Sequence, residues 1–423
     1  MRLRMGLVVA TLLAGFPASA QVLTLEDCVR LALTAPSSVT VARQETDIAR
    51  AGVGVARAGF LPQARIDRSF AYNSPLLGSP DQFSFVALNG VREYLSQFGM
   101  AQEVDTSGRL RAALARARAD RDAAAAGLLV TTRDVKRAVT AAYYRLLLAR
   151  RLVAVNRQSL EEARDFEART RLLAKNGEAA EADVVKAAAQ VAFLDQSQRA
   201  AELDAEMANH ELASFWTDKV AEPLSIEDML DGPAPLPEQA QPAASGAFLR
   251  RPEFNLLEAR RQGFLADARQ IHAQLLPQLS MVFQYGIDAQ RVNIRDRGYA
   301  AFVNLNIPVF DWFRTRNQQR QFQLRAGQVE ADRAQAARTF SKEYENALAR
   351  VRLIHEQIAI TVRQVELSEA NLKLSRLRYE GGEGPVLDVV VAQTQLTQAR
   401  SNRYAAMAAY LSARADLEVA SGQ

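Results

Sequence analysis

The fold is decided by residues 344–379, which read YENALARVRLIHEQIAITVRQVELSEANLKLSRLRY. Apolar or small side chains recur there in alternating steps of three and four, at Tyr344, Ala347, Val351, Ile354, Ile358, Thr361, Val365, Ser368, Leu372, Ser375 and Tyr379. This spacing keeps one narrow stripe of a helix against a neighbouring helix, as in a coiled coil. A second series with the same steps comprises Val135, Val139, Ala142, Leu146, Ala149, Val153, Asn156, Leu160 and Ala163. We therefore expect long helices packed along narrow seams.

The spacing of the 14 prolines permits such helices, because proline breaks a helix interior. No proline lies between Pro80 and Pro223, or between Pro308 and Pro385. A continuous helix over residues 108–176 would be roughly 100 Å long at about 1.5 Å per residue. The sequence therefore predicts an elongated, mainly helical molecule.

The order of short motifs predicts an internal duplication. The Leu-Pro-Gln at 61–63 recurs at 276–278, and Asp105 has a counterpart in Asp311. The triplet Asp183-Val184-Val185 recurs at 388–390. We expect helix, strand, strand, long helix, turn and helix in residues 21–222, and the same series in residues 249–423. Five prolines between residues 223 and 242 predict a linker at 223–248.

Alternating side chains predict the strands. Residues 280–287 and 299–307 each alternate apolar with polar or small positions, over about the nine residues that a tilted strand needs to cross a bilayer. Weaker strands are expected at 66–72 and within 94–104. Residues 288–298 are expected to form a polar loop, and a longer loop is expected through Pro75 and Pro80.

Four strands are too few to close a barrel in one chain, since at least eight are usual. A transmembrane barrel would therefore require several protomers to contribute strands side by side. The alternative is a soluble coiled coil that carries two small hairpins, and the strand pattern alone does not decide between them.

The N-terminus indicates export. Arg2 and Arg4 precede an apolar run at 7–16, and Ala18-Ser19-Ala20 is an A-x-A cleavage signal, so residues 1–20 are expected to be a signal peptide. Cys28 follows Leu25-Glu26-Asp27, well beyond that cleavage point. It is expected to pack as a small hydrophobic residue, not to carry a lipid anchor.

The residues argue against catalysis and nucleic-acid binding. The formal net charge is +4, and no tract of like charges suggests a nucleic-acid partner. His210, His272 and His355 are isolated, so we expect no metal site, no cofactor and no catalytic residues. An enzyme of the export compartment would need a clustered acid–base or nucleophile set.

In several short motifs the sequence resembles the outer-membrane efflux protein family of TolC-like channels. The motifs, which span nearly the whole mature chain, are Leu23-Thr24-Leu25-Glu26-Asp27, the two Leu-Pro-Gln triplets, Arg251-Pro252-Glu253, Ile307-Pro308-Val309-Phe310-Asp311, Tyr379-x-x-Gly382 and Leu387-Asp388-Val389-Val390. Each motif is short, and their order and duplication carry the specificity.

This resemblance implies a homotrimer in the bacterial outer membrane. Each chain would give four strands to a twelve-stranded barrel in contact with outer-membrane lipid, continuous with a helical barrel in the periplasm. Such a channel is a passive export duct that works with a periplasmic adaptor protein and an inner-membrane pump. The alternative is a soluble periplasmic coiled-coil scaffold or adaptor. The exported substrate and the pump class are not predicted.

The resemblance also implies two kinds of site. Asp388 matches an acidic position at the narrow periplasmic entrance, and Asp183 is its first-repeat counterpart. The family often has a second acidic residue one turn later, where this chain has Val391. Alternatively, both aspartates cap the helices that follow. The expected adaptor-contacting tips are Lys175, Asn176, Gly177 and Glu178, and Glu380, Gly381, Gly382, Glu383, Gly384 and Pro385.

Overall fold

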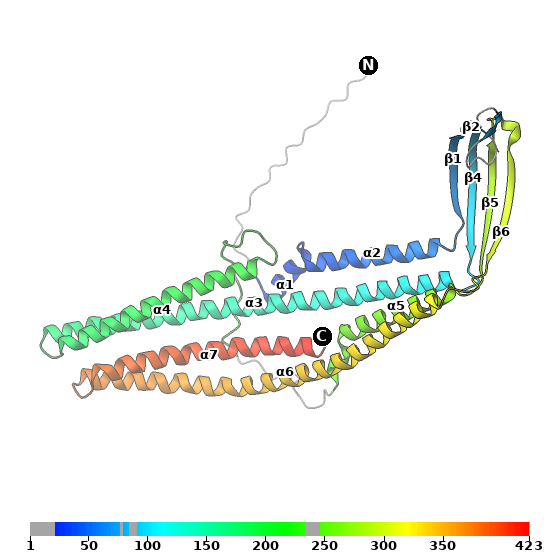
Figure 1. Ribbon diagram of the computed structural model, residues 1–423. Helices are drawn as coiled ribbons and strands as arrows, with labels where there is room; N and C mark the ends of the chain where they lie inside the picture. Colours follow the sequence, from blue (N-terminus) through cyan, green and yellow to red (C-terminus); the bar gives the residue numbers. More distant parts are fainter. Residues whose placement is uncertain (1–21, 77–78, 84–90, 233–245, 423) are drawn as a thin grey trace, which may run out of the picture. The chain divides into compact units, whose positions relative to one another are not determined.

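The computed structural model describes residues 22–76, 79–83, 91–232 and 246–422. The expected signal peptide and residues 233–245 of the expected linker lie outside the described residues. The chain divides into two compact units, which are described separately (Figure 1). Unit 1 contains Met1–Ala35, Lys136–Pro237 and Arg350–Ala415, and unit 2 contains Pro36–Val135, Glu238–Ala349 and Asp416–Gln423.

Two helices of 67 residues each, α3 (Arg109–Lys175) and α6 (Arg314–Glu380), confirm the expected long helices. In unit 1, α3 turns into α4 (Glu181–Ala213) and α6 turns into α7 (Val386–Ala420), which makes two helical hairpins (Figure 1). Among the described residues, no helix combines the length and the apolar character that a membrane crossing requires.

The predicted seams are the buried faces of these helices. No residue of either heptad series is exposed, and Leu146 and Val351 are completely buried. Both hairpins of unit 1 contribute to one shared core. It includes Phe166 of α3, Ala187 of α4, Tyr379 of α6 and Val389 of α7. Close packing of these small and apolar side chains holds the two hairpins together.

A short helix, α1 (Leu25–Thr34), begins the described part of unit 1. Thr24 and Asp27 form a reciprocal capping box, because the Thr24 hydroxyl accepts from the Asp27 N–H while the Asp27 carboxylate accepts from the Thr24 N–H. Cys28 is fully buried, as expected, and burial raises the pKa of its thiol to about 11.

Unit 2 contains α2 (Ser38–Ala58), α5 (Pro252–Ala273) and the sheet. The sheet has the order β1-β4-β5-β6, all antiparallel. Its strands are β1 (Gln63–Tyr72), β4 (Arg92–Val104), β5 (Gln278–Ala289) and β6 (Gly298–Asn306). The pairing of β4 with β5 joins the strand pair that precedes α3 to the strand pair that precedes α6.

The connection between β1 and β4 differs from the expected loop. It contains a separate two-stranded sheet of β2 (Pro75–Leu76) and β3 (Ser79–Phe83). Sequence reasoning missed this hairpin, because proline at the start of a short strand resembles loop punctuation. The expected loop at 288–298 is also shorter, since β5 reaches Ala289 and a 3₁₀ turn occupies Ile294–Asp296.

Candidate functional site

The sheet separates apolar from polar side chains. In an antiparallel sheet, residues paired across strands point to the same face. The pairs Phe98–Tyr285 and Tyr285–Tyr299 therefore mark one face, which we call the apolar face. It comprises Ala64, Ile66, Arg68, Phe70 and Tyr72 of β1, Arg92, Tyr94, Ser96, Phe98, Met100, Gln102 and Val104 of β4, Leu279, Met281, Phe283, Tyr285, Ile287 and Ala289 of β5, and Tyr299, Ala301, Val303 and Leu305 of β6.

The opposite face is mostly polar or small, and we call it the polar face. Its members are Gln63, Arg65, Asp67, Ser69 and Ala71 of β1, Glu93, Leu95, Gln97, Gly99, Ala101 and Glu103 of β4, Gln278, Ser280, Val282, Gln284, Gly286 and Asp288 of β5, and Ala300, Phe302, Asn304 and Asn306 of β6. Arg65 and Asp67 form an ion pair on it, with 2.7 Å between the guanidinium and carboxylate atoms.

The described residues leave much of the apolar face uncovered. Val303 is 68% exposed and Tyr299 is 79% exposed, and both belong to a larger exposed apolar set on the same face. Aromatic rings contact one another across the strands near the loop end, with ring centroids 5.0 Å apart for Phe70 and Tyr94 and 6.4 Å apart for Phe283 and Tyr299. An exposed apolar surface of this extent marks an interface with lipid or protein.

The two predicted tips have the same backbone geometry. Gly177 (φ 80°) and Gly382 (φ 74°) adopt the left-handed conformation after α3 and α6. The N–H of Glu178 donates to the carbonyl of Leu173, and the N–H of Glu383 donates to that of Arg378, both at 2.9 Å. These are the hydrogen bonds of a glycine-terminated helix end. The two turns therefore correspond residue by residue.

The tip residues are largely accessible. Lys175, Asn176, Gly177 and Glu178 are exposed, as are Glu380 to Glu383 and Pro385, whereas Gly384 is half-buried. In a single chain, these residues are therefore accessible to a binding partner.

Asp183 and Asp388 both lie in the first turn of the helix that follows their tip. The N–H of Asp183 donates to the carbonyl of Ala180, and that of Asp388 donates to the carbonyl of Pro385. The N-cap residue of α4 is Ala180, which makes no side-chain cap, so Asp183 is the third residue of its helix. Asp388 is likewise the third residue of α7, which begins at Val386. Their negative charges still favour the positive end of the helix dipole.

The two aspartates have different surroundings. The carboxylate of Asp183 is partly covered and lies 3.4 Å from the ammonium of Lys186. Asp388 is exposed, and within the described ranges its carboxylate has no ion-pair or hydrogen-bond partner. Val391, one turn later, is also exposed. The side chains of Val386 and Val389 are buried on the other face of α7.

Sequence reasoning missed an arginine that ties the hairpins of unit 1 together. Arg400 of α7 contacts Glu162 of α3 at 3.1 Å and Glu369 of α6 at 3.2 Å, and its side chain is only 15% exposed. A further link joins Gln190 of α4 to Thr394 of α7. No signal in the sequence identifies Glu162 and Glu369 as the partners of Arg400, because arginine and glutamate are common throughout α3 and α6.

Unit 2 has a buried charge cluster around the Arg-Pro-Glu motif. Arg251 donates to Glu253 at 2.7 Å and to Glu343 at 2.6 Å, and its guanidinium lies 3.8 Å from the centre of the Phe340 ring. Arg133 of α3 also donates to Glu253. Burial opposes the charge of Glu253, but the hydrogen bonds from Arg133 and Arg251 outweigh it and hold the pKa of this carboxyl at about 2.

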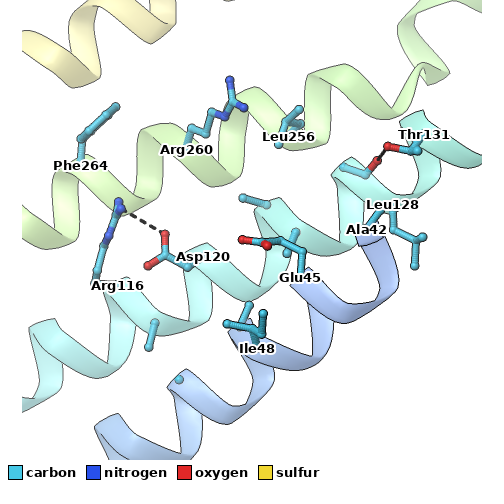
Figure 2. Close-up of a pocket in the computed structure, with 16 residues that line it drawn as sticks. Ala42, Glu45, Ile48, Arg116, Asp120, Leu128, Thr131, Leu256, Arg260 and Phe264 are labelled. Atoms are coloured by element: carbon cyan, nitrogen blue, oxygen red, sulfur yellow. Dashed lines mark hydrogen bonds and ion pairs between the residues drawn. The ribbon is translucent and has the colours of Figure 1, made fainter. Parts of the chain in front are cut away.

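An open groove with a volume of about 790 Å³ runs between α2, α3 and α5 in unit 2 (Figure 2). Ile48 of α2 and Phe264 of α5 give it apolar walls, and Arg116 is paired with Asp120 at 3.1 Å beside it. Most of its other lining residues are alanine or glycine, including Gly52. Small side chains allow another helix to approach closely.

The described residues contain no group of three or more His, Cys, Asp or Glu side chains that could hold a metal ion. The three histidines lie on different helices: His210 on α4, His272 on α5 and His355 on α6.

The sequence was compared with the profiles of known protein families. The profile of the family described as outer membrane efflux protein matches residues 29–216 and 243–423. Protein CyaE of Bordetella pertussis is 26% identical over 377 residues, which cover 86% of this chain and 76% of that protein.

Solved structures show the same fold. The outer-membrane channel OprN superimposes with a TM-score of 0.81 at 22% identity, covering 94% of this chain and 89% of that one. The Campylobacter jejuni CmeC outer membrane channel gives a TM-score of 0.84 at 16% identity, covering 94% and 85%. The predicted combination of long packed helices with a four-stranded sheet is thereby confirmed.

Proposed function

The chain belongs to the outer membrane efflux protein family, and from this premise we propose that it is one subunit of a trimeric export channel. It is an outer-membrane protein, and like its family it is a transport protein and not an enzyme. In more detail, we propose that three chains form a passive duct from the periplasm to the outside. An inner-membrane pump supplies the energy for export.

The observation that carries this proposal is the division of the sheet into an apolar and a polar face. A strand in a transmembrane barrel turns apolar side chains to lipid and polar ones to the interior, in alternation. Val303 and Asn304, adjacent on β6, follow this rule, as do Met281 and Ser280 on β5. We infer that the apolar face contacts outer-membrane lipid and the polar face lines the duct.

Closure requires more than one chain. In the described part of the sheet, β1 and β6 each pair with a strand on one side only. An unpaired edge is costly in lipid, because no water satisfies its backbone groups. Three copies would join β6 of one chain to β1 of the next and give twelve strands. The groove beside α2 (Figure 2) offers small and apolar side chains to a helix of a neighbouring copy.

In this proposal the paired hairpins of three chains form the periplasmic tunnel, and their tips contact a periplasmic adaptor. The matching turns at Gly177 and Gly382 support a duplicated origin for residues 21–222 and 249–423. Both turns present exposed side chains, as a docking surface requires.

Asp388 is the proposed constriction residue. Threefold symmetry would turn its exposed carboxylate into a ring of three, which attracts cations. Val391 leaves the next turn of α7 without a second acidic ring. Asp183, already beside Lys186, would contribute a weaker field.

Single-channel conductance in planar bilayers, together with the mass of the particle in detergent, tests the channel. Discrete conductance steps from a trimer-sized particle are expected. A monomer that never inserts, even after refolding in detergent, would refute the channel and leave the soluble scaffold as the better interpretation.

Replacing Asp388 by Ala tests the constriction. Loss of the ring should lower cation selectivity, because a fixed negative charge is removed from the narrow entrance. The reversal potential in a salt gradient measures this. Glu383→Ala removes the same charge from the tip and should leave the reversal potential unchanged. Equal reversal potentials for wild type and Asp388→Ala would argue against a lining role.

A further inference from the structure

The apolar face of the sheet has two charged residues in the described strands, and both are arginines. They are Arg68 of β1 and Arg92 of β4, and no Asp or Glu of the described strands lies on this face. A charge on the lipid side of a transmembrane strand is costly at the bilayer midplane and nearly neutral at the membrane–water interfaces. The depth of the two arginines therefore decides what they can bind.

The register of the sheet gives that depth. Val104 is the last residue of β4 on the helix side, and the charged Asp105 follows it, so the apolar band of the sheet begins near Val104. From Val104 to Tyr94 the strand spans roughly 33 Å, or about 25 Å along the membrane normal when it tilts by about 40°. That is the height of the apolar band of an outer-membrane protein. Arg68 lies on the helix side of the level of Tyr94, and Arg92 lies on its loop side.

An aromatic pair separates the two arginines. Phe70 pairs with Tyr94 across β1 and β4, and their ring centroids are 5.0 Å apart. Arg68 pairs with Ser96, four residues along β4 from Arg92, which is roughly 13 Å of strand. The order along the face is therefore cation, aromatic pair, cation. We call Arg68, Phe70, Tyr94 and Arg92 the arginine–aromatic patch.

Neither arginine of the patch is neutralised within the chain. Both are exposed, and within the described residues neither guanidinium has an ion-pair or hydrogen-bond partner. By contrast, Arg65 on the polar face of β1 forms an ion pair with Asp67. A guanidinium binds phosphate well, because its planar N–H donors match two phosphate oxygens at once. The long side chain of Arg68 can also reach from its strand position toward the interface.

The spacing of the arginines favours a lipid with two phosphates. A glycerophospholipid has one phosphate diester beside its headgroup, which a single arginine can bind. The lipid A part of lipopolysaccharide, the glycolipid of bacterial outer leaflets, has one phosphate at each end of a disaccharide. Two arginines separated by an aromatic pair match two phosphates separated by two sugar rings.

We propose that the arginine–aromatic patch binds the diphosphorylated glycolipid of the outer leaflet. Arg68 and Arg92 each bind one phosphate, and Phe70 and Tyr94 contact the disaccharide between the phosphates. Three chains would present three such sites on the outside of the barrel. This proposal rests on the proposed membrane-crossing role of the sheet, which places the loop end of the strands at the outer leaflet.

Counting bound glycolipid tests the site. The purified full chain in non-ionic detergent is titrated with diphosphorylated lipid A, and the bound lipid is counted by native mass spectrometry. Wild type should saturate at one lipid A for each chain. The double variant Arg68→Gln, Arg92→Gln should bind at least about tenfold more weakly, because two charge-assisted contacts are lost. Arg65→Gln removes a charge from the opposite face of β1 and should bind like wild type.

Lipid A that lacks one phosphate assigns the contacts. Monophosphorylated lipid A should bind wild type about as weakly as diphosphorylated lipid A binds one of the two single variants. In that single variant, removal of the phosphate should weaken binding no further, because the arginine that it contacts is already absent. This comparison uses single variants, so it tests the site even if the double variant folds poorly.

Two results would overturn the glycolipid site. Equal affinity of wild type and the double variant for lipid A would show that the arginines do not bind it. If phosphatidylglycerol binds wild type as tightly as lipid A does, the patch does not recognise a pair of phosphates.

The conductance of wild type separates this proposal from the proposed function. If wild type inserts into planar bilayers and conducts, but binds lipid A no more tightly than the double variant does, the channel stands and only the glycolipid site is wrong. If wild type neither inserts nor binds lipid A, both proposals fail.

Discussion

The sheet and the hairpin core use apolar side chains in opposite ways. In the hairpins of unit 1, Val386, Val389 and Ala392 are completely buried by the chain's own helices. On the sheet of unit 2, Val303 and Tyr299 remain largely exposed. The hairpins are therefore stabilised within one chain, whereas the described chain leaves the apolar side chains of the sheet exposed; in the proposed channel, lipid covers them. A residue's burial in one chain thus reports only part of its environment.

The largest expected effect comes from the hairpin core. Leu396 is 3% exposed, so Leu396→Ala should lower the free energy of unfolding by about 2–5 kcal/mol through lost burial and a residual cavity. Chemical denaturation followed by helical circular dichroism measures this. The matched control Gln364→Ala, at an exposed position of α6, should change it by less than about 0.5 kcal/mol. Equal effects would contradict the assigned core.

The second prediction tests the two faces of the sheet. Val303→Arg places a charge on the apolar face and should cost about 2–4 kcal/mol of membrane stability near the bilayer centre. Asn304→Arg places the same charge one residue away on the polar face and should cost much less. The fraction of protein that folds into vesicles over a urea series measures both. If Asn304→Arg is the more damaging variant, the faces are assigned the wrong way round.

The third prediction, with the smallest expected effect, concerns how the stability of unit 2 depends on pH. The pKa of Glu253 is depressed to about 2 from an ordinary value of 4.5, so its contribution to stability is complete above pH 4.5 and is lost as the pH falls toward 2. Thermal midpoints between pH 5 and pH 2.5 should therefore decline.

A carboxylate on the same helix provides the control for this pH dependence. Glu253→Gln should flatten the decline, although its midpoint starts lower because Arg251 loses a buried partner. Glu258→Gln, whose partner Arg261 lies 3.3 Å away at the surface, should leave the slope intact. If the thermal midpoints of wild type and Glu253→Gln fall equally with pH, Glu253 does not cause the decline.

Much of the fold follows from local sequence rules. The heptad series through Leu146 and Val351 correctly predicts the buried seams, and the alternation at 280–287 and 299–307 correctly predicts β5 and β6. These predictions succeed because periods of 3.5 and 2 are properties of the chain itself. The hairpin of β2 and β3 was missed, since short strands beside prolines carry little periodic signal.

The candidate sites are less predictable. The tips around Gly177 and Gly382 can be located from glycine after a long helix, and the structure gives both the same turn. The sequence gives no indication that Arg400 bridges Glu162 and Glu369, because many arginines and glutamates could pair. The positive φ angles of Trp312 and Phe313 could not be predicted either, since no residue type at this junction indicates them.

By itself, the sequence determined the extent of the first long helix, the two glycine turns and the residues able to alternate in strands. Each of these depends on neighbours along the chain. Only the tertiary structure decided which strands pair, and hence that Phe98, Tyr285 and Tyr299 share one face. Register is a relation between distant segments, and a slip of one residue would exchange the two faces of a strand, which is why local patterns alone could not supply it.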